Sequence, residues 1–388
     1  MTTIINNENK KLNVPNLRFP EFQGEWEKCR LADVCSFFSG GTPSSSNKDF
    51  YGGNIPFIRS GELHKEETEL FITQSGYENS SAKMVEVGDL LLAMYGATSG
   101  DVAISKIKGA INQAILCIRT KHNNKFIESV WNKHVSKILV KYLQGGQGNL
   151  SADIVKRISF SLPSLAEQKK ISHLMQLIDV RIATQNKIIG KLQSLIKGIV
   201  DCTILRKEKN AIVGDVCSIS EQIRAEANID DIITVRLHGK GVCKSSAENL
   251  QLGATQYYRR RAGQLIYGKQ NFHNGAIGIV PISLDNGITS KDIPSFDIDE
   301  MKCNSVYLLA QLQSPQYYKP AEALTTGTGS KRLKEETFLK MPIVLPNKRE
   351  QDNIAVLIHR VSMNLGHAKK LLELLSIQKQ FLLRQMFI

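Results

Sequence analysis

The chain has 388 residues, of which 42% are hydrophobic and 22% are charged, and its formal net charge is +13. This length exceeds what one ordinary hydrophobic core organises, so two or more domains are expected, and the apolar content argues against wholesale disorder. The basic excess favours a polyanionic partner, with nucleic acid as the first candidate and an anionic membrane as the second, against the alternative of a basic protein with no such partner.

Cysteine usage and hydropathy narrow the class of protein further. The seven cysteines are scattered and odd in number, and no Cys-x-x-Cys pair occurs. This pattern argues against a disulfide framework and against a zinc site, and it predicts a reducing cytoplasm as the location. No apolar run approaches the roughly 20 residues that span a membrane, and the first residues lack the apolar core of a secretory signal.

The first half is predicted to contain an N-terminal arm, residues 1–25, and a globular α+β domain, residues 26–161. Short β-prone pieces alternate with glycine-bearing turns and precede a helix at about residues 126–143. Glycine lets backbone amides approach phosphate closely, and Arg, Asn and Gln side chains can read base edges. The loops of this domain supply the first candidate DNA contacts, which are Arg59, Ser60, Tyr95, Thr98, Gln147 and Asn149.

A long helix is predicted next, over residues 162–207. Pro163 suits the chain just before a first turn, and Glu167 suits the positive end of the helix dipole. Apolar residues then recur at alternating steps of three and four, which is the pattern of a heptad seam. The residues predicted to pair with another helix are Ile171, Leu174, Ile178 and Leu192.

The second half repeats this order, with a globular domain at residues 208–344 and a long helix at residues 345–388. The tetrapeptide Asp-Val-Cys-Ser occurs near the start of each domain, at 33–36 and at 215–218. Polar, glycine-bearing loops and clustered positive charge again predict DNA contacts. These candidates are Arg236, His238, Lys240, Arg259, Arg260, Lys269, Asn271, His273, Lys331 and Arg332.

The strongest internal match joins the two helix starts. Leu-Pro-x-x-x-Glu-Gln occurs at 162–168 and again at 345–351, a separation of 183 residues that also relates the apolar positions after it. Because both helices carry the same register, we expect them to pair with each other rather than only with their own domains. Arg181 and Asn364 share one polar slot and are predicted to determine that register. The second set of pairing residues is Ile354, Leu357, Val361 and Leu375.

No catalytic constellation is evident in the sequence. The segment 263–269 has the spacing of a phosphate-binding loop, but Gln270 stands where that motif needs Ser or Thr to reach magnesium. The acidic positions Asp297 and Glu300 have no counterpart in the first half, and neither an HExxH motif nor a dinucleotide-binding fingerprint occurs. We therefore predict a non-enzymatic adaptor with no catalytic residue and no metal site.

This architecture resembles the specificity subunits of type I restriction-modification enzymes. The resemblance is carried by the two Leu-Pro-x-x-x-Glu-Gln helix starts with their heptad helices, the two Asp-Val-Cys-Ser openings and the N-terminal stretch 14–26. It implies two target recognition domains, each reading one half of a bipartite, asymmetric DNA site. It also implies that the helices pair as an antiparallel coiled coil and set the spacer. Roughly forty helical residues make a rod of about 60 Å, which exceeds one DNA turn of about 34 Å.

The resemblance further implies partners and cofactors. Two modification subunits would dock on the helices and methylate adenine at N6 with S-adenosylmethionine. Two restriction subunits would translocate and cleave DNA with ATP and magnesium. The chain itself would bind double-stranded DNA, hold no cofactor and catalyse nothing alone. The residues by themselves leave two alternatives open: a stand-alone nucleic-acid adaptor, and a coiled-coil scaffold whose basic charge serves protein or membrane docking.

Overall fold

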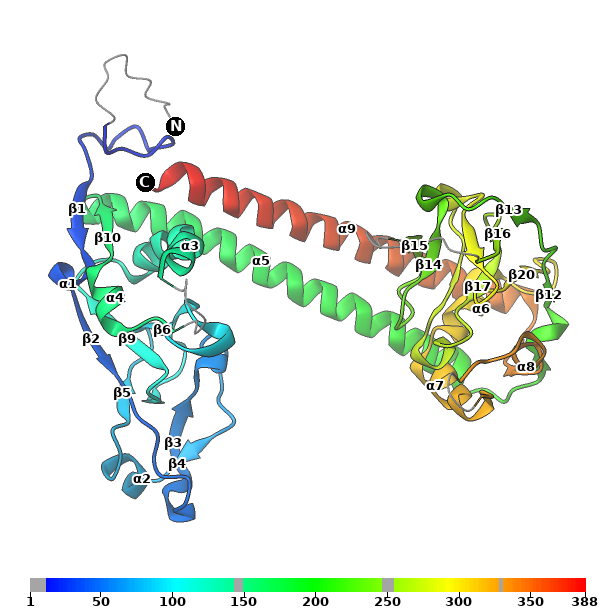
Figure 1. The fold of residues 1–388 in the computed structure, drawn as a ribbon, viewed down its shortest axis with the longest axis horizontal. Coiled ribbons are helices and arrows are strands. Elements are labelled where there is room, and N and C mark those ends of the chain that lie inside the picture. The colour runs from blue at the N-terminus through cyan, green and yellow to red at the C-terminus, as the bar shows by residue number, and fades with distance from the viewer. Residues whose placement is uncertain (1–11, 143–148, 246–254, 328–330) are drawn as a thin grey trace. The chain divides into compact units, whose positions relative to one another are not determined.

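The computed structural model describes four stretches of the chain, namely residues 12–142, 149–245, 255–327 and 331–388. The chain forms two compact units, whose elements are labelled in Figure 1. Unit 1 comprises Met1–Gln185 and Leu371–Ile388, and unit 2 comprises Asn186–Lys370. Each unit therefore contains one globular domain together with parts of both long helices. The sequence pattern instead predicts each long helix as one undivided segment, separate from the globular domains.

Two four-stranded sheets form the globular part of unit 1. The first consists, in order, of β2 (Cys35–Ser39), β9 (Ile115–Thr120), β6 (Leu90–Ala93) and β7 (Val102–Ile104). The second consists of β4 (Phe71–Ile72), β3 (Tyr51–Ile58), β8 (Gly109–Ile111) and β5 (Lys83–Val85), with β3 and β8 parallel. Strand β6 has apolar residues at every position because its two faces lie in different cores, with Leu90 on one side and Leu91 on the other.

Helices close the first sheet of unit 1 on one face. Helix α3 (Asn124–Tyr142) contributes Phe126 and Trp131 to the core, and the Trp131 indole N–H donates to the Gly100 carbonyl oxygen at 2.8 Å. The short helices are α1 (Leu31–Val34), α2 (Gln74–Glu78) and α4 (Ala152–Arg157). Strand β1 (Glu27–Arg30) pairs with β10 (Ser159–Leu162), so the domain starts and ends beside the first residues of α5 (Leu165–Val200).

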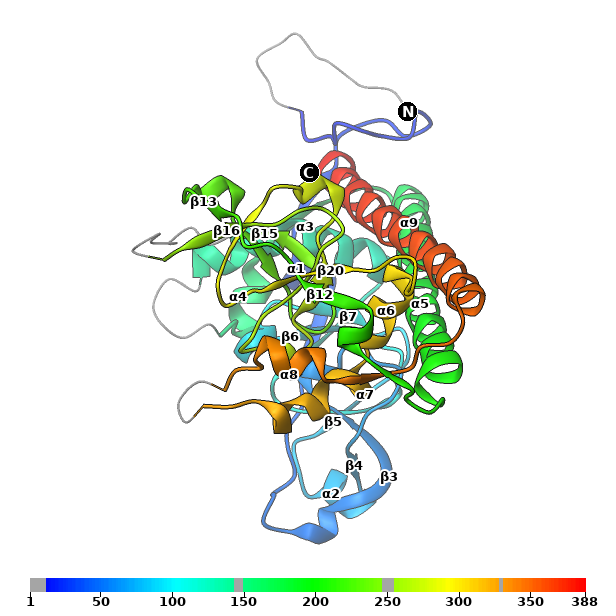
Figure 2. The same ribbon diagram turned by 90° about the vertical axis from the view of Figure 1, so that its right-hand side faces the viewer.

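Unit 2 repeats this plan with shorter strands, several of which are labelled in Figure 2. Its four-stranded sheet has the matching order β12 (Cys217–Ile219), β20 (Ser295–Ile298), β17 (Leu265–Tyr267) and β18 (Ile277–Ile279). The pair β11 (Ala211–Ile212) and β21 (Pro342–Ile343) corresponds to β1 and β10. The remaining strands are β13 (Arg224–Ala225), β16 (Tyr257–Arg259) and β19 (Ile288–Ser290) in one sheet and β14 (Ile233–Val235) with β15 (Val242–Lys244) in another.

An aromatic cluster fills the core of unit 2. Tyr267, Phe272, Phe296 and Phe338 have ring centroids between 4.7 and 5.8 Å apart and are buried. Edge-to-face and tilted aromatic pairs stabilise a core beyond the area that they bury. The helices of this unit are α6 (Ser305–Leu312), α7 (Pro315–Tyr318), α8 (Glu335–Leu339), most of α9 (Lys348–Met386) and the end of α5.

The two long helices pack against each other in opposite directions within each unit. In unit 1 the start of α5 (Leu165–Val200) shares a core with the end of α9, through Ile171 and Leu382. In unit 2 the end of α5 shares a core with the start of α9, through Ile199 and Ile354. This antiparallel packing agrees with the architecture that the family resemblance implies.

The positions that are buried along the two long helices differ from the predicted heptad positions at every second residue of the series. The positions of this series on α5 are buried or half-buried, and so are the α9 residues 183 positions later. The α5 positions are Ile171, Met175, Ile178, Ile182, Gln185, Ile189, Leu192, Ile196 and Ile199. The prediction is wrong for Leu357, which is 46% exposed while Ile358 beside it is buried. Leu174 is only half-buried, and Arg181 and Asn364 are exposed, so neither polar residue determines the register from a seam position.

The reason for this error is that apolar residues occur at both the third and the fourth position after a buried one. Leu174 and Met175 both follow Ile171, and Leu357 and Ile358 both follow Ile354. Periodicity alone cannot choose between neighbours that are equally apolar. Packing in the core of each unit makes the choice, and it selects Met175 and Ile358, which are 1% and 5% exposed.

Candidate nucleic-acid interface

One backbone hydrogen bond occurs at equivalent places in the two units and joins two of the predicted DNA-contact loops. In unit 1 the Leu150 amide donates to the Met94 carbonyl oxygen at 2.8 Å. In unit 2 the Leu333 amide donates to the Lys269 carbonyl oxygen at 2.9 Å. The two acceptors follow the equivalent strands β6 and β17, and the two donors lie 183 positions apart. Each unit therefore holds two loops together at the same end of its main sheet.

In unit 1 this bond places Asn149 next to the turn that carries Tyr95 and Thr98. The turn is the 3-10 helix Gly96–Thr98, and both Tyr95 and Asn149 are exposed. Gly100 ends the turn with φ +87°, and a Cβ there would meet the side chains of α3 at 2.9 Å. Glycine therefore lets the turn lie flat on the helix. Three predicted residues thus lie near one another, whereas Gln147 lies outside the described residues.

In unit 2 the corresponding loop ends in a short bridge between Thr326 and Arg332, whose backbones exchange hydrogen bonds of 3.1 and 2.9 Å. Lys269 and Arg332 come from two separately predicted loops, and they line one pocket. Their charges are partly neutralised, since Lys269 pairs with Glu335 at 2.7 Å and Arg332 with Asp292 at 3.3 Å. Lys331 is exposed and pairs with Glu322 at 3.2 Å.

A second turn of unit 2 joins the same region. The His238 amide donates to the Asn274 carbonyl oxygen at 2.7 Å, and the Gly239 amide donates to the Gly275 carbonyl oxygen at 2.9 Å. These bonds attach the turn bearing Arg236, His238 and Lys240, all exposed, to the turn bearing Asn271 and His273. His238 takes the left-handed conformation, with φ 61°, and also lines a pocket with α6.

The basic run at 259–261 divides between the surface and the core. Arg259 is exposed, but Arg260 is 0% exposed. Its guanidinium donates to Thr289 Oγ1 at 2.7 Å, to Ser295 Oγ and to the Ile293 carbonyl oxygen, both at 2.9 Å. The prediction that Arg260 contacts DNA is therefore wrong, because its donors are consumed inside the domain. Residues alternate across a strand, so an unbroken run of arginines cannot present all its charges on one face.

Arg59 lies at the surface but faces two carboxylates. Its guanidinium is 3.1 Å from Glu62 and 3.3 Å from Glu69, and its side chain is 46% exposed. Burial by itself raises the pKa of the Glu62 carboxyl, but hydrogen bonds from Arg59, the Glu69 amide and Thr68 lower that pKa to about 2. Ser60, next to Arg59, is half-buried. The pair makes Glu62 a stabilising carboxylate at neutral pH.

We expect Glu62→Gln to remove a pH-dependent contribution to stability. A carboxyl whose folded pKa is depressed stabilises the fold above its usual pKa near 4.5, and that contribution is lost as pH falls toward 2. The free energy of unfolding of the variant should be lower by up to about 3 kcal/mol at neutral pH, with the difference shrinking below about pH 4.5. Chemical denaturation across this range measures it. A constant difference from pH 7 to pH 3 would contradict the assignment, and Glu69→Gln, at an exposed carboxylate, is the control.

The sequence motif at each helix start has a structural role that the sequence alone did not show. Gln168 Nε2 donates to the Pro163 carbonyl oxygen at 2.9 Å, and Gln168 Oε1 accepts from the Asn123 amide at 3.2 Å, just before α3. Gln351 makes the same two contacts, with Pro346 at 2.8 Å and with the Asn304 amide at 2.9 Å, just before α6. Each glutamine thus couples a long helix to the helix of its globular domain. Its recurrence in both halves was the only available signal.

Comparison with known proteins finds similarity to type I restriction-modification specificity subunits. The family described as "Type I restriction modification DNA specificity domain" matches residues 23–194. The MjaVIII type I restriction enzyme specificity subunit of Methanocaldococcus jannaschii is 21% identical over 374 residues, covering 87% of this chain and 86% of the relative. The chain is therefore similar to type I restriction-modification specificity subunits along most of its length. The EcoR124I/EcoR124II specificity subunit of Escherichia coli is 26% identical over 175 residues, covering 42% of this chain and 43% of the relative.

Solved structures share the fold of this chain. The S subunit of a type I restriction-modification system from M. genitalium has a TM-score of 0.66 at 12% identity, covering 97% of this chain and 99% of the other. A chain from a structure describing complex assembly of the type I system has a TM-score of 0.53 at 13% identity. Within the described residues of this chain, no helix is both long and apolar enough to cross a membrane, and no cluster of His, Cys, Asp or Glu could hold a metal ion.

Proposed function

We propose that this chain is the DNA-reading subunit of a type I restriction-modification complex. The domain of unit 1 reads one half of an asymmetric, bipartite site in double-stranded DNA, and the domain of unit 2 reads the other half. One observation carries this proposal. The main sheets of the two units have the same strand order, but the loops at the same end of each sheet carry different side chains. Tyr95 and Asn149 occupy this end in unit 1, and Lys269, Asn271 and Arg332 occupy it in unit 2. Different side chains on one frame suit two different base sequences.

The long helices are proposed to hold the two domains apart and to dock two modification subunits. Their outer faces retain large apolar side chains at positions that correspond between the repeats. Val180 and Met363 are 56% and 49% exposed, and Ile188 and Leu371 are 42% and 38% exposed. Apolar patches exposed on a helix favour a protein partner. Two matching patches favour two copies of the same partner, which agrees with a complex that contains two methyltransferases.

The chemistry of the complex is assigned to the partner subunits. In this proposal the modification subunits transfer a methyl group from S-adenosylmethionine to adenine N6, and two restriction subunits use ATP and magnesium to translocate and cleave DNA. This chain chooses the sequence, contributes no catalytic group and acts in the cytoplasm, where these subunits meet DNA. Its basic net charge of +13 is consistent with a role in which it contacts DNA phosphates.

Methylome sequencing of a host that carries the three subunit genes tests the proposal. We expect two methylated half-sites of different sequence, separated by a gap of constant length. A host with the modification gene but without this chain should lose that pattern. A variant in which residues 208–344 are exchanged for those of another family member should change one half-site and keep the other. A single continuous methylated motif would contradict the two-domain assignment.

A further inference from the structure

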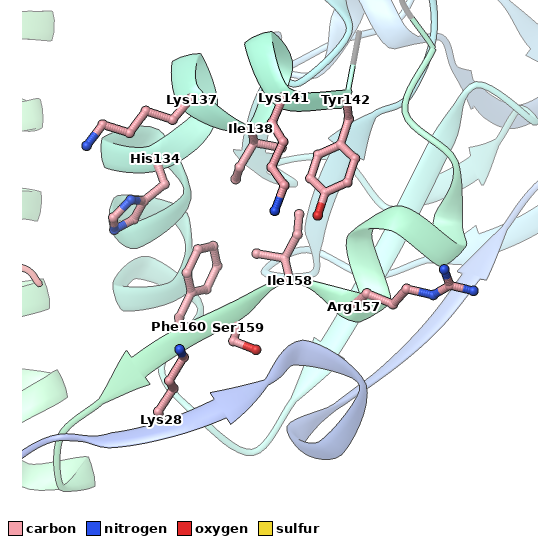
Figure 3. A pocket seen from close by; sticks show the side chains of 10 residues that line it. All are labelled: Lys28, His134, Lys137, Ile138, Lys141, Tyr142, Arg157, Ile158, Ser159 and Phe160. Carbon is pink, nitrogen blue, oxygen red and sulfur yellow. The ribbon is translucent and has the colours of Figure 1, made fainter. Parts of the chain in front are cut away.

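A basic pocket lies in unit 1 where the end of α3 faces β1 and the junction of α4 with β10. Its volume is about 330 Å³, and its floor contains the buried side chains Ile158 and Phe160. Figure 3 shows Lys141 extending from α3 toward Ile158, while Lys28 and Arg157 come from the opposite side. Lys137, one turn earlier on α3, completes the set of four cations. The pocket thus combines an apolar floor with a positively charged rim.

The four cations of this rim have no partner carboxylate within ion-pair distance among the described residues. Across the described residues none of them forms an ion pair, and no acidic side chain lines the pocket. Lys156, next to Arg157 on α4, does have such a partner, Asp153 at 3.3 Å. Like charges that gather without a counter-charge raise the local positive potential, and a concave site focuses it. An anion would relieve this repulsion.

The positive charges near the pocket also affect the pKa of the neighbouring His134 imidazole. Burial lowers the pKa of His134, and the charges of Lys133 and Lys137 lower it further, although the Ile388 carbonyl oxygen at 2.7 Å opposes the shift. His134 lines the same pocket and stacks on Phe160 with ring centroids 5.7 Å apart. This shift favours the neutral imidazole, and the lysines and Arg157 supply the charge of the pocket.

We propose that this pocket holds a backbone phosphate of the bound DNA, beside the half-site that unit 1 reads. The inference rests on the proposed function. The position of the pocket supports this inference. Helix α3 ends at Tyr142 and α4 begins at Ala152, so the elements that line the pocket flank the loop containing Asn149. An acidic protein surface is the less favoured occupant, since the apolar docking faces lie on the long helices rather than at this loop. Phosphate contacts position a reading domain without reading sequence.

The second half keeps basic residues at the corresponding place. Arg157 has Lys340 as its counterpart 183 positions later, at the same distance before the closing strand. Lys209, just before β11, lies 5.7 Å from the ring centroid of Tyr317 on α7. In unit 1, Lys28 is the second residue of the equivalent strand β1, and it lines the pocket together with the end of α3. Both units therefore carry basic side chains in or beside the closing strands.

The experiment measures how salt affects DNA binding by the assembled complex. The variant Lys141→Gln with Arg157→Gln should reduce the slope of log K against log salt by about 0.9, the value for one lost phosphate contact. Affinity at low salt should fall by about tenfold for target and non-target DNA alike, so selectivity stays unchanged. The control is Lys106→Gln with Lys156→Gln, which removes the same charge at lysines paired with Glu66 and Asp153. It should keep the wild-type slope.

Three other results decide against the proposal. An unchanged slope in the pocket variant would overturn it. Loss of the modification subunit on co-purification, with the slope retained, would assign the pocket to an acidic protein surface and also overturn it. A large change in target selectivity would mean that these side chains read bases. If the first variant does not fold, Lys28→Gln with Lys137→Gln tests the opposite rim by the same measurement. A wild-type complex whose binding ignores salt would instead contradict the proposed function.

Discussion

Replacing Arg260 with alanine is expected to destabilise the domain of unit 2 by about 3 to 5 kcal/mol, whereas Arg259→Ala should leave its stability unchanged. Arg260 is 0% exposed and donates to Thr289, Ser295 and the Ile293 carbonyl oxygen. Truncation leaves these acceptors without their donors and opens a cavity. Burial lowers the pKa of Arg260 to about 10, so the group remains charged at neutral pH. Its role is to hold β16 and β19 together from inside.

Chemical denaturation of the full chain measures this effect, and amide hydrogen exchange in β16 and β19 localises it. Arg259→Ala is the matched control, because it removes the same side chain one position away, where the residue is exposed. We expect it to weaken DNA binding several-fold and to leave the denaturation midpoint in place. If Arg260→Ala retained full stability and lost DNA affinity, the buried assignment would be wrong, and the original prediction for Arg260 would stand.

The second large effect is expected at the buried ion pair between Arg18 and Glu167. The two guanidinium–carboxylate hydrogen bonds are each 2.8 Å, and the side chains are 6% and 1% exposed. Glu167→Gln leaves a buried guanidinium without its counter-charge, which costs about 3 to 5 kcal/mol in typical proteins. Because Arg18 belongs to the N-terminal arm, the variant should also release that arm from α5. A lower denaturation midpoint, together with faster proteolytic cleavage within residues 12–26, would demonstrate both consequences.

The repeat itself supplies the control for this prediction. Glu350 is the counterpart of Glu167, but its partner Lys207 and Glu350 itself are 39% and 40% exposed. Exposed ion pairs contribute about 1 kcal/mol or less, so Glu350→Gln should shift the midpoint only slightly. Arg18→Met combined with Glu167→Leu should recover much of the lost stability, because neither charge then remains unpaired. Equal losses in Glu167→Gln and Glu350→Gln would contradict the role of burial.

Sequence periodicity and repetition predicted the architecture but only part of the candidate interface. The loops carrying Tyr95, Thr98 and Asn149 were predicted separately, and the structure brings them together through the Leu150 amide. Loop composition identifies residues that can contact DNA, but it contains no information on which loops meet. The same limit applied to Arg59, whose carboxylate partner Glu62 follows by three residues but whose second partner, Glu69, follows by ten.

By itself the sequence determined the two-fold repeat, the positions of the long helices and their common register, because a spacing of 183 residues and a heptad pattern are properties of the chain order. Only the tertiary structure decided which of two adjacent apolar residues is buried in a core, which arginine of a run of three is buried, and what Glu167 and Gln168 contact. Those outcomes depend on contacts between residues far apart in the chain, whose energies local patterns do not contain. The lysines and arginine of the basic pocket illustrate this limit, since Lys28, Lys141 and Arg157 come from three separate segments.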